Sequence, residues 1–125
     1  IRILGDLLLG KALQEAIVNH GNDFFSLRRA ERWTHKPDAE VIDHHFSSAC
    51  YIDKAFPASL YLAWKYAGRF KDGIIANTNI GGDNCHRGAV IGALLGADCG
   101  LKGIPVDWRR SLLMNRSLGQ LPLFV

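Results

Sequence analysis

The sequence predicts an all-α fold, and three observations support this prediction. Apolar residues recur at helical spacing in several segments, as Leu60, Trp64 and Ala67 do at positions i, i+4 and i+7. Proline, glycine and acidic residues stand where helices commonly begin and end. No segment combines sustained two-residue alternation with β-branched residues, the pattern typical of strands. We therefore expect a bundle of helices with no internal repeat and no interdomain linker.

Two helices are expected in the first part of the chain. The first covers residues 6–19, where apolar residues recur at helical spacing and Gly21 follows as a stop signal. Residues 22–36 are polar and irregular, so no regular element is expected there. The second helix begins at Pro37, with acidic residues in its first turn, and runs to about His45.

Four further helices are expected in the rest of the chain, where proline and glycine again mark the boundaries. A polar loop over residues 77–79 separates the second of them from the third. In chain order the four are a helix that begins at Pro57 and ends at Gly68, a short one over residues 71–76, a longer one over residues 83–98, and a last one that begins at Pro105.

The length and composition describe one domain. The chain has 125 residues, of which 48% are hydrophobic and 22% charged, close to the average of globular proteins. Its net charge of +3 is scattered, so no nucleic-acid binding is predicted. Three cysteines without a Cys-x-x-Cys pair indicate neither a disulfide framework nor a thiolate zinc site, and reduced cysteines favour a cytoplasmic protein. Residues 89–97 form the longest apolar run, which is too short to span a membrane.

The helix expected over residues 83–98 carries a stripe of small residues. Gly88, Gly92 and Gly96 follow one another at four-residue spacing. Each glycine costs about 1 kcal/mol of helix stability relative to alanine. We therefore expect another helix to lie close along this stripe, and neighbours to cover this central helix on several sides.

Polar residues crowd onto the beginning of the same helix. Gly81 and Gly82 lead directly into its N-terminus, where free backbone N–H groups and the helix dipole favour phosphate or carboxylate ligands. Asp83 or Asn84 would also serve as an ordinary N-cap. The density of polar side chains nevertheless predicts a binding site, with the candidates Asn77, Asn79, Asp83, Asn84, His86 and Arg87.

A family resemblance is carried by residues 77–105, which read NTNIGGDNCHRGAVIGALLGADCGLKGIP. This segment resembles the closing signature of the ADP-ribosylglycohydrolase family, the group that includes the crystallin J1 relatives, and the resemblance extends upstream over residues 50–70 and downstream to Trp108. It implies the C-terminal part of an all-α, multi-helix bundle. It also implies a hydrolase that cleaves the glycosidic bond between ADP-ribose and an unidentified acceptor, with two magnesium ions at the centre of the bundle.

The same resemblance implies roles for individual residues. In the family pattern Gly-Gly-Asp is followed by any residue, a second Asp and a Thr, whose oxygens bind the metals. Asp83 matches the first Asp, so it is predicted to be the catalytic residue and a metal ligand. Cys85 and His86 stand where the second Asp and the Thr are expected, and thiol or imidazole groups are poor ligands for magnesium. The predicted substrate-binding residues are Asn77, Asn79, Gly81, Gly82, Asn84, His86 and Arg87.

The altered loop leaves several interpretations open. One magnesium ion is retained on Asp83 with carboxylates from elsewhere, or His86 and Arg87 hold the substrate diphosphate without a metal bridge. A third interpretation, a softer metal site on Cys85 and His86, has only two ligands. The alternative to an enzyme is a non-catalytic family member that binds ADP-ribose-like ligands or has a structural, crystallin-like role. The oligomeric state is left open.

The N-terminal half of the family pattern has no counterpart here. That half carries a Thr-Asp-Asp-Thr-like segment with further metal ligands, whereas the clustered acids of this chain, Asp38, Glu40 and Asp43, stand in a different context. The chain also begins at Ile1 rather than at a methionine. We expect residues 1–125 to be a single, partial ADP-ribosylglycohydrolase-like domain from the C-terminal portion of a larger protein.

Two other motifs have simpler explanations than a catalytic role. Residues 41–45, Val-Ile-Asp-His-His, are similar to the Asp-His-His element of a manganese phosphoesterase family, but no buried strand precedes them and no Asp-x-Asp pattern lies upstream. A simpler explanation of this segment is that histidines are favoured at a helix C-terminus, beside the negative end of the helix dipole. Cys50 and Cys85 would be candidate nucleophiles beside a histidine, although no local context supports this chemistry. Tyr61, Trp64 and Tyr66 are expected in the core.

Overall fold

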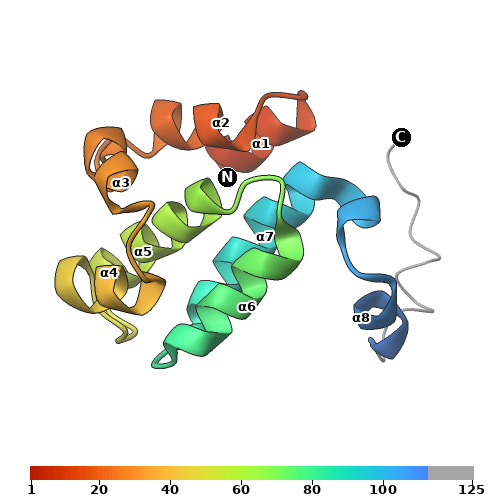
Figure 1. The fold of residues 1–125 in the computed structure, drawn as a ribbon. Coiled ribbons are helices and arrows are strands. Elements are labelled where there is room, and N and C mark those ends of the chain that lie inside the picture. The colour runs from red at the N-terminus through yellow and green to blue at the C-terminus, as the bar shows by residue number, and fades with distance from the viewer. Residues whose placement is uncertain (113–125) are drawn as a thin grey trace.

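The computed structural model describes residues 1–112, and within them the chain forms eight helices and no strand, which confirms the predicted all-α fold. Figure 1 shows α1 and α2 on one side of α5, α3 and α4 at one end, and α6 and α7 side by side. The helices are α1 (Arg2–Leu8), α2 (Leu13–His20), α3 (Leu27–Trp33), α4 (Asp38–His45), α5 (Ile52–Lys65), α6 (Phe70–Ile80), α7 (Asn84–Gly103) and α8 (Val106–Ser111).

The hydrophobic core is built around α5. Its residues 58–63 are almost fully buried, and the core continues through Ile17 of α2, Ile42 of α4 and Ile91 of α7. Tyr61 is inaccessible to solvent and Trp64 is 8% exposed, so both belong to the core as predicted. α5 contacts α2, α6 and α7, and α1 and α2 also contact α7 directly, so the first and last helices pack both against α5 and against each other.

The first part of the chain differs from the prediction in two places. The prediction of a single helix over residues 6–19 was wrong. Gly10, which lies between α1 and α2, adopts a φ of +81° and turns the chain. The prediction that residues 22–36 form no regular element was also wrong. They contain α3, which buries Ala30 and places Trp33 against the core. Tertiary packing of these two residues compensates for the weak helical pattern of the segment.

Two boundaries in the middle of the chain were also predicted wrongly. α5 begins at Ile52, so Pro57 lies inside the helix rather than opening it. Proline has no N–H to donate to the carbonyl of Asp53, and Asp53 is an exposed residue. α6 extends to Ile80, so residues 77–79 are its last turn and not a loop.

The small-residue stripe of α7 faces α6, as expected. An added Cβ at Gly92 would lie 3.7 Å from Cδ1 of Ile74, and one at Gly96 would lie 3.7 Å from Cε2 of Phe70. These are ordinary contact distances, whereas a Cβ on Gly88 would lie 3.1 Å from Nδ2 of Asn77, so the expected close approach is found at Gly88 but not at the other two glycines. α7 also contacts α1, α2 and α5, so neighbours cover it on several sides as predicted, although Ala89, Ala93 and Ala97 are exposed.

α7 continues past the predicted end at residue 98 to Gly103, with a break at Gly100, whose φ is +61° and ψ is −177°. α8 follows Pro105, where a helix was predicted. Among the helices of residues 1–112, none has both the length and the apolar character needed to cross a membrane.

Candidate functional site

The candidate site is the turn between α6 and α7. Gly81 has a φ of +74° and a ψ of −155°, and Gly82 has a φ of +62°; L side chains disfavour both conformations. A Cβ on Gly82 would overlap the carbonyl group of Ser48. The glycine pair therefore allows the turn to lie directly against the segment that joins α4 to α5.

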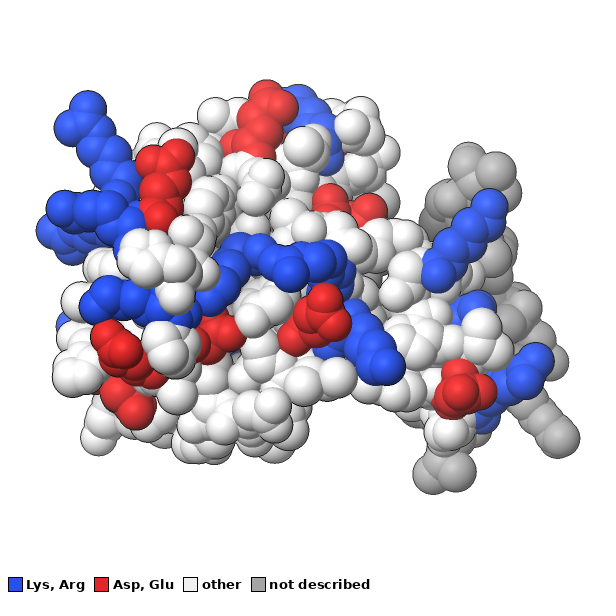
Figure 2. All heavy atoms as spheres, in the orientation of Figure 1, with Lys and Arg blue, Asp and Glu red and all other residues white. Residues whose placement is uncertain are grey.

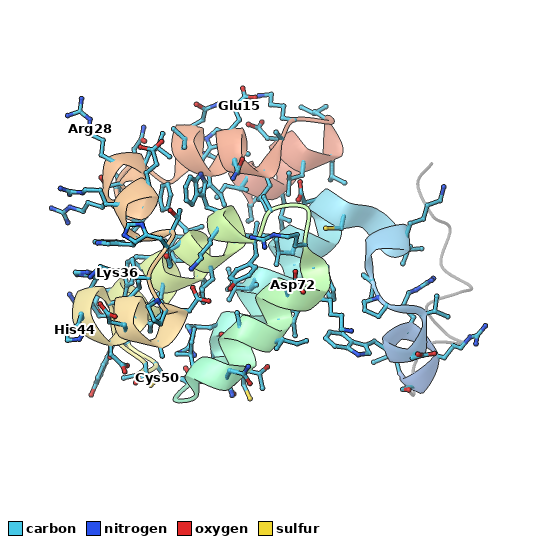
Figure 3. All side chains as sticks on the ribbon, in the orientation of Figure 1. Glu15, Arg28, Lys36, His44, Cys50 and Asp72 are labelled. Carbon is cyan, nitrogen blue, oxygen red and sulfur yellow. The ribbon has the colours of Figure 1, made fainter. Side chains whose placement is uncertain are left out.

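Ser48 fixes the position of this turn. Its carbonyl oxygen accepts a hydrogen bond of 2.8 Å from the backbone N–H of Asp83 and one of 3.2 Å from Nη1 of Arg87. Two segments far apart in sequence therefore meet at one carbonyl. Figure 3 labels Cys50, which lies at this end of the molecule, near the turn that follows α6.

Arg87 is the most deeply buried polar residue of the site, with 1% of its surface exposed. Its Nε donates to Oδ1 of Asn77 at 3.0 Å, and its Nη2 donates to the carbonyl of Gly81 at 2.7 Å. All three of its nitrogens thus meet neutral oxygens of the protein. The side chain holds α6, α7 and the turn together.

The charge of Arg87 is compensated only at a distance. Burial lowers the pKa of its guanidinium, while the charges of Asp83 and Asp43 act in the opposite direction. Among residues 1–112 no carboxylate forms an ion pair with it within 4.0 Å. A guanidinium remains charged at neutral pH, so the site carries a buried positive charge bonded by uncharged groups.

Asn77 completes this arrangement from the last turn of α6. It is 3% exposed, and its Nδ2 donates to the carbonyl of Asn84 at 2.8 Å while its Oδ1 accepts from Arg87. Asn84 in turn places its Nδ2 3.4 Å from the carbonyl of Thr78. The two asparagines join the end of α6 to the beginning of α7.

Asp83 precedes α7 and pairs with His86. Nδ1 of His86 lies 2.7 Å from one carboxylate oxygen and 2.9 Å from the other. A carboxylate only accepts in such a contact, so the N–H at Nδ1 is the donor. The Asp83 side chain is 17% exposed, whereas that of His86 is 83% exposed. This dyad forms the solvent-facing part of the site.

The backbone at the start of α7 is also open to a ligand. Asp83 occupies the N-cap position, but its side chain makes no capping hydrogen bond. The first N–H groups of a helix have no acceptor within the helix, and they carry the positive end of its dipole. The N–H of Asp83 donates to the carbonyl of Ser48 and that of Asn84 to the carbonyl of Gly82 at 2.9 Å, so the N–H groups of Cys85 and His86 are the donors that remain for an anionic group.

The predicted site residues do not all come together. Asn77, Gly81, Gly82, Asp83, Asn84, His86 and Arg87 meet at the turn. Asn79 lies apart from them and lines a hollow of about 510 Å³ beside Asp38 and Tyr66, between α4 and α6. Ser48 and Asp43 were not predicted as part of the site, because neither stands in a local motif that points to α7.

The donor set of the turn does not fit two magnesium ions. Asp83 supplies the only carboxylate of the turn, and both oxygens of this carboxylate contact His86. Cys85 and His86 offer sulfur and nitrogen, whereas magnesium prefers oxygen ligands in octahedral geometry. Within residues 1–112 no three His, Cys, Asp or Glu side chains are grouped so that they could hold a metal ion.

Comparison with known proteins gives one finding about the family. A family model described as ADP-ribosylglycohydrolase matches residues 3–123, nearly the whole chain. The match includes residues 3–49, for which the sequence motifs gave no assignment. No curated protein and no solved structure matches the chain.

Proposed function

The chain belongs to the ADP-ribosylglycohydrolase family, and we propose that it contributes to hydrolysis of the glycosidic bond between ADP-ribose and an acceptor at the turn formed by Gly81–Arg87. The observation that carries this proposal is the Asp83–His86 dyad. It places an oriented carboxylate at the solvent-facing start of α7, in the position where the family pattern has its first Asp.

The residues of the turn are suited to separate tasks in this reaction. A carboxylate can accept a proton from a water molecule as that water attacks the anomeric carbon of the ribose. Asp83 would be this group, and His86 would hold its orientation through the contacts at 2.7 and 2.9 Å. Attack forms the bond between the water oxygen and the anomeric carbon, and the acceptor leaves with the bonding electron pair and takes up a proton.

Substrate binding would use the rest of the turn. The N–H groups of Cys85 and His86 and the side chain of Asn84 would contact the diphosphate, and the buried charge of Arg87 adds a positive potential behind them. Asn77 and Arg87 would act as positioning residues, because their polar atoms are bonded within the protein. Gly81 and Gly82 allow the backbone to take the required conformation, and Asn79 would reach only a more distant part of the substrate.

Family membership also bears on the cofactor. Members of this family are generally metal-dependent. The turn of this chain does not supply the oxygen ligands that a pair of magnesium ions requires, so the roles given above rest on Asp83, His86 and the helix N-terminus.

A second function, binding of ADP-ribose without hydrolysis, is supported by a specific observation. Cys85 and His86 replace the expected Asp and Thr, and His86 occupies the oxygens of the remaining carboxylate. Under this proposal the family fold and the anion-binding turn are kept for recognition of ADP-ribose-like ligands.

One experiment separates the two functions. We expect the protein to release ADP-ribose from an ADP-ribosylated arginine peptide or another ADP-ribosylated acceptor, and Asp83→Asn to reduce this rate by roughly a hundredfold or more. Asp53→Asn, which alters an exposed aspartate in the first turn of α5, is the matched control and retains the rate. Unchanged turnover in Asp83→Asn contradicts the assignment of Asp83. Calorimetric binding of ADP-ribose without any hydrolysis, with or without added magnesium, supports the second function instead.

A further inference from the structure

The outer face of α3 is a basic surface that lies away from the turn formed by Gly81–Arg87. Arg28, Arg29 and Arg32 are all exposed there, and we call these three residues the arginine face. Figure 2 shows Lys and Arg side chains gathered over α3 at the upper left of the view, and Figure 3 shows Arg28 pointing away from the fold. Neither the family resemblance nor the proposed function gives this face a role.

The arginine face has no partner within the described part of the chain. None of the ion pairs among residues 1–112 involves its three side chains. The arginine side chains that donate hydrogen bonds within these residues are those of Arg69, Arg87 and Arg109, which all lie on other elements. The guanidinium groups of the arginine face are therefore available to acceptors outside the protein.

The placement of these charges opposes the stability of α3. Arg28 and Arg29 stand in the first turn, which contains no acidic residue, although the positive end of the helix dipole disfavours cations there. Arg28 and Arg32 also lie at positions i and i+4, where like charges repel each other. Three charges that weaken their own helix and brace no other element are explained by contact with an anionic partner.

The surroundings of the arginine face favour a protein as this partner. Phe24, in the segment before α3, is 51% exposed and meets Phe56 edge to face, with ring centroids 5.3 Å apart. α3 carries three arginines and no lysine, and protein interfaces are enriched in arginine and aromatic residues but depleted of lysine. Glu31 lines an open hollow of about 540 Å³ together with Arg28 and Arg32, so a continuous phosphate backbone would meet a like charge there.

We propose that the arginine face docks an acidic segment of a partner protein. Carboxylates of this segment accept hydrogen bonds from Arg28, Arg29 and Arg32, because a guanidinium matches the geometry of a carboxylate and can bind it through two parallel bonds. An apolar side chain of the segment packs on the exposed part of Phe24. The surface thus fits a partner segment in which acidic and apolar residues are mixed.

Fluorescence anisotropy with the whole chain tests the proposal. The probe is a labelled peptide of repeated Glu-Glu-Leu, about 15 residues long so that it more than spans α3, and the same peptide with Gln in place of Glu lacks the charge. We expect the Glu peptide to bind at least tenfold more tightly than the Gln peptide, because only the Glu peptide offers carboxylates to the arginines. Its affinity should fall as salt is added, since salt screens exposed charges.

Single substitutions then locate the contact. Arg28→Gln, Arg29→Gln and Arg32→Gln should each weaken binding of the Glu peptide about threefold, the usual effect of losing one exposed ion pair. Arg110→Gln is the matched control, because it removes the same exposed charge from α8, at the other end of the fold in Figure 1. This control should leave the affinity unchanged, and so should Asp83→Asn, which alters the proposed hydrolase site.

Thermal unfolding separates docking from a role in folding. Arg28→Gln removes the cation from the first turn and its repulsion with Arg32, so the variant should melt about 1–2 °C higher than the unaltered protein although it binds the peptide more weakly. A lower melting temperature would mean that Arg28 serves the fold, and it would overturn the proposal.

Three binding results would also overturn it. The first is a Glu peptide that binds no more tightly than the Gln peptide. The second is an Arg110→Gln protein weakened as much as the variants of the arginine face, since that result indicates attraction by the net charge alone. The third is tighter binding of single-stranded DNA of similar charge, or of phosphatidylcholine vesicles that contain phosphatidylserine, because the partner would then be a nucleic acid or a membrane.

Discussion

The buried guanidinium of Arg87 donates from Nε to Oδ1 of Asn77 across 3.0 Å, and this bond joins α7 to the last turn of α6. Both residues are almost inaccessible to solvent. The same guanidinium reaches the carbonyls of Ser48 and Gly81, so one side chain positions the turn that carries Asp83. The shape of the candidate site therefore depends on a residue that is not itself open to solvent.

Replacing Arg87 should destabilise the protein. Arg87→Met keeps an unbranched side chain but leaves the carbonyl of Gly81 and the Oδ1 of Asn77 without their donor and removes one of the two donors to the carbonyl of Ser48, so we expect a loss of about 3 kcal/mol in the free energy of unfolding. Urea unfolding followed by circular dichroism measures this loss. The exposed Arg28→Met should change the free energy by less than about 0.5 kcal/mol. Equal effects of the two substitutions would contradict a bracing role for Arg87.

A second prediction concerns the glycine pair, Gly81 and Gly82. Gly82→Ala should cost about 3 kcal/mol, because a Cβ would be strained at a φ of +62° and would overlap Ser48. Gly68→Ala, at a φ of +75° with nothing within 4 Å of the added atom, should cost about 1 kcal/mol. Thermal or urea unfolding of both variants checks the difference. A Gly82→Ala protein no less stable than Gly68→Ala would exclude the contact with Ser48.

The stripe on α7 leads to a prediction of the opposite sign. Gly92→Ala should stabilise the protein by roughly 0.5–1 kcal/mol, since its Cβ would meet Ile74 at an ordinary 3.7 Å and alanine has the higher helix propensity. Gly73→Ala, on the facing helix α6, should instead destabilise it, because the added Cβ overlaps the side chain of Leu95. Paired melting curves measure both signs. A destabilised Gly92→Ala would mean that α6 and α7 lie closer together than in this structure.

The junction of α1 and α2 should make stability depend on acidity. Asp6 lies 3.0 Å from both Lys11 and His20, and the hydrogen bond from Lys11 is the main cause that lowers the pKa of its carboxyl; His20 adds to this, and burial opposes it. The carboxyl therefore has a lower pKa in the folded state than in the unfolded state. Its contribution is fully present above the ordinary pKa of about 3.9 and is lost as the pH falls through the folded value.

Asp6→Asn provides the test. Urea unfolding at pH 7 and at pH 3 should show a smaller difference in stability for this variant than for the unaltered protein, because the titrating group is gone. Asp53→Asn, which removes an exposed aspartate that makes no ion pair within residues 1–112, is the control and should keep the original difference. If Asp6→Asn retains the full difference, the Lys11 and His20 contacts do not act on Asp6 in the folded state.

The starts of several helices could be predicted from the local sequence alone. α4 and α8 begin directly after Pro37 and Pro105, and α7 follows the Gly-Gly pair, because proline and glycine restrict or free the backbone wherever they stand. Pro57 shows where such reasoning fails. The local sequence predicts that a helix begins at Pro57. The free energy gained by burying one face of α5 nevertheless outweighs the loss of the one hydrogen bond that proline cannot make.

The residues of the candidate site divide in the same way. The local sequence identified the turn, its two glycines and Asp83, since these residues are neighbours in the chain. It also grouped Asn79 with them, whereas the helical rotation of α6 turns Asn77 toward Arg87 and places Asn79 in the hollow beside Asp38. No local pattern indicated Ser48, whose contribution is a backbone carbonyl.

By itself, the sequence determined the all-α class, the family resemblance and the Gly-Gly-Asp turn, because helix periodicity, backbone freedom and motif spacing are properties of adjacent residues. Only the tertiary structure decided that Arg87 braces the turn from inside, that His86 pairs with Asp83, and that Trp33 and Tyr61 meet edge to face. The physical reason is that the direction and burial of a side chain depend on what packs against it, and in this protein the partner residues come from distant parts of the chain.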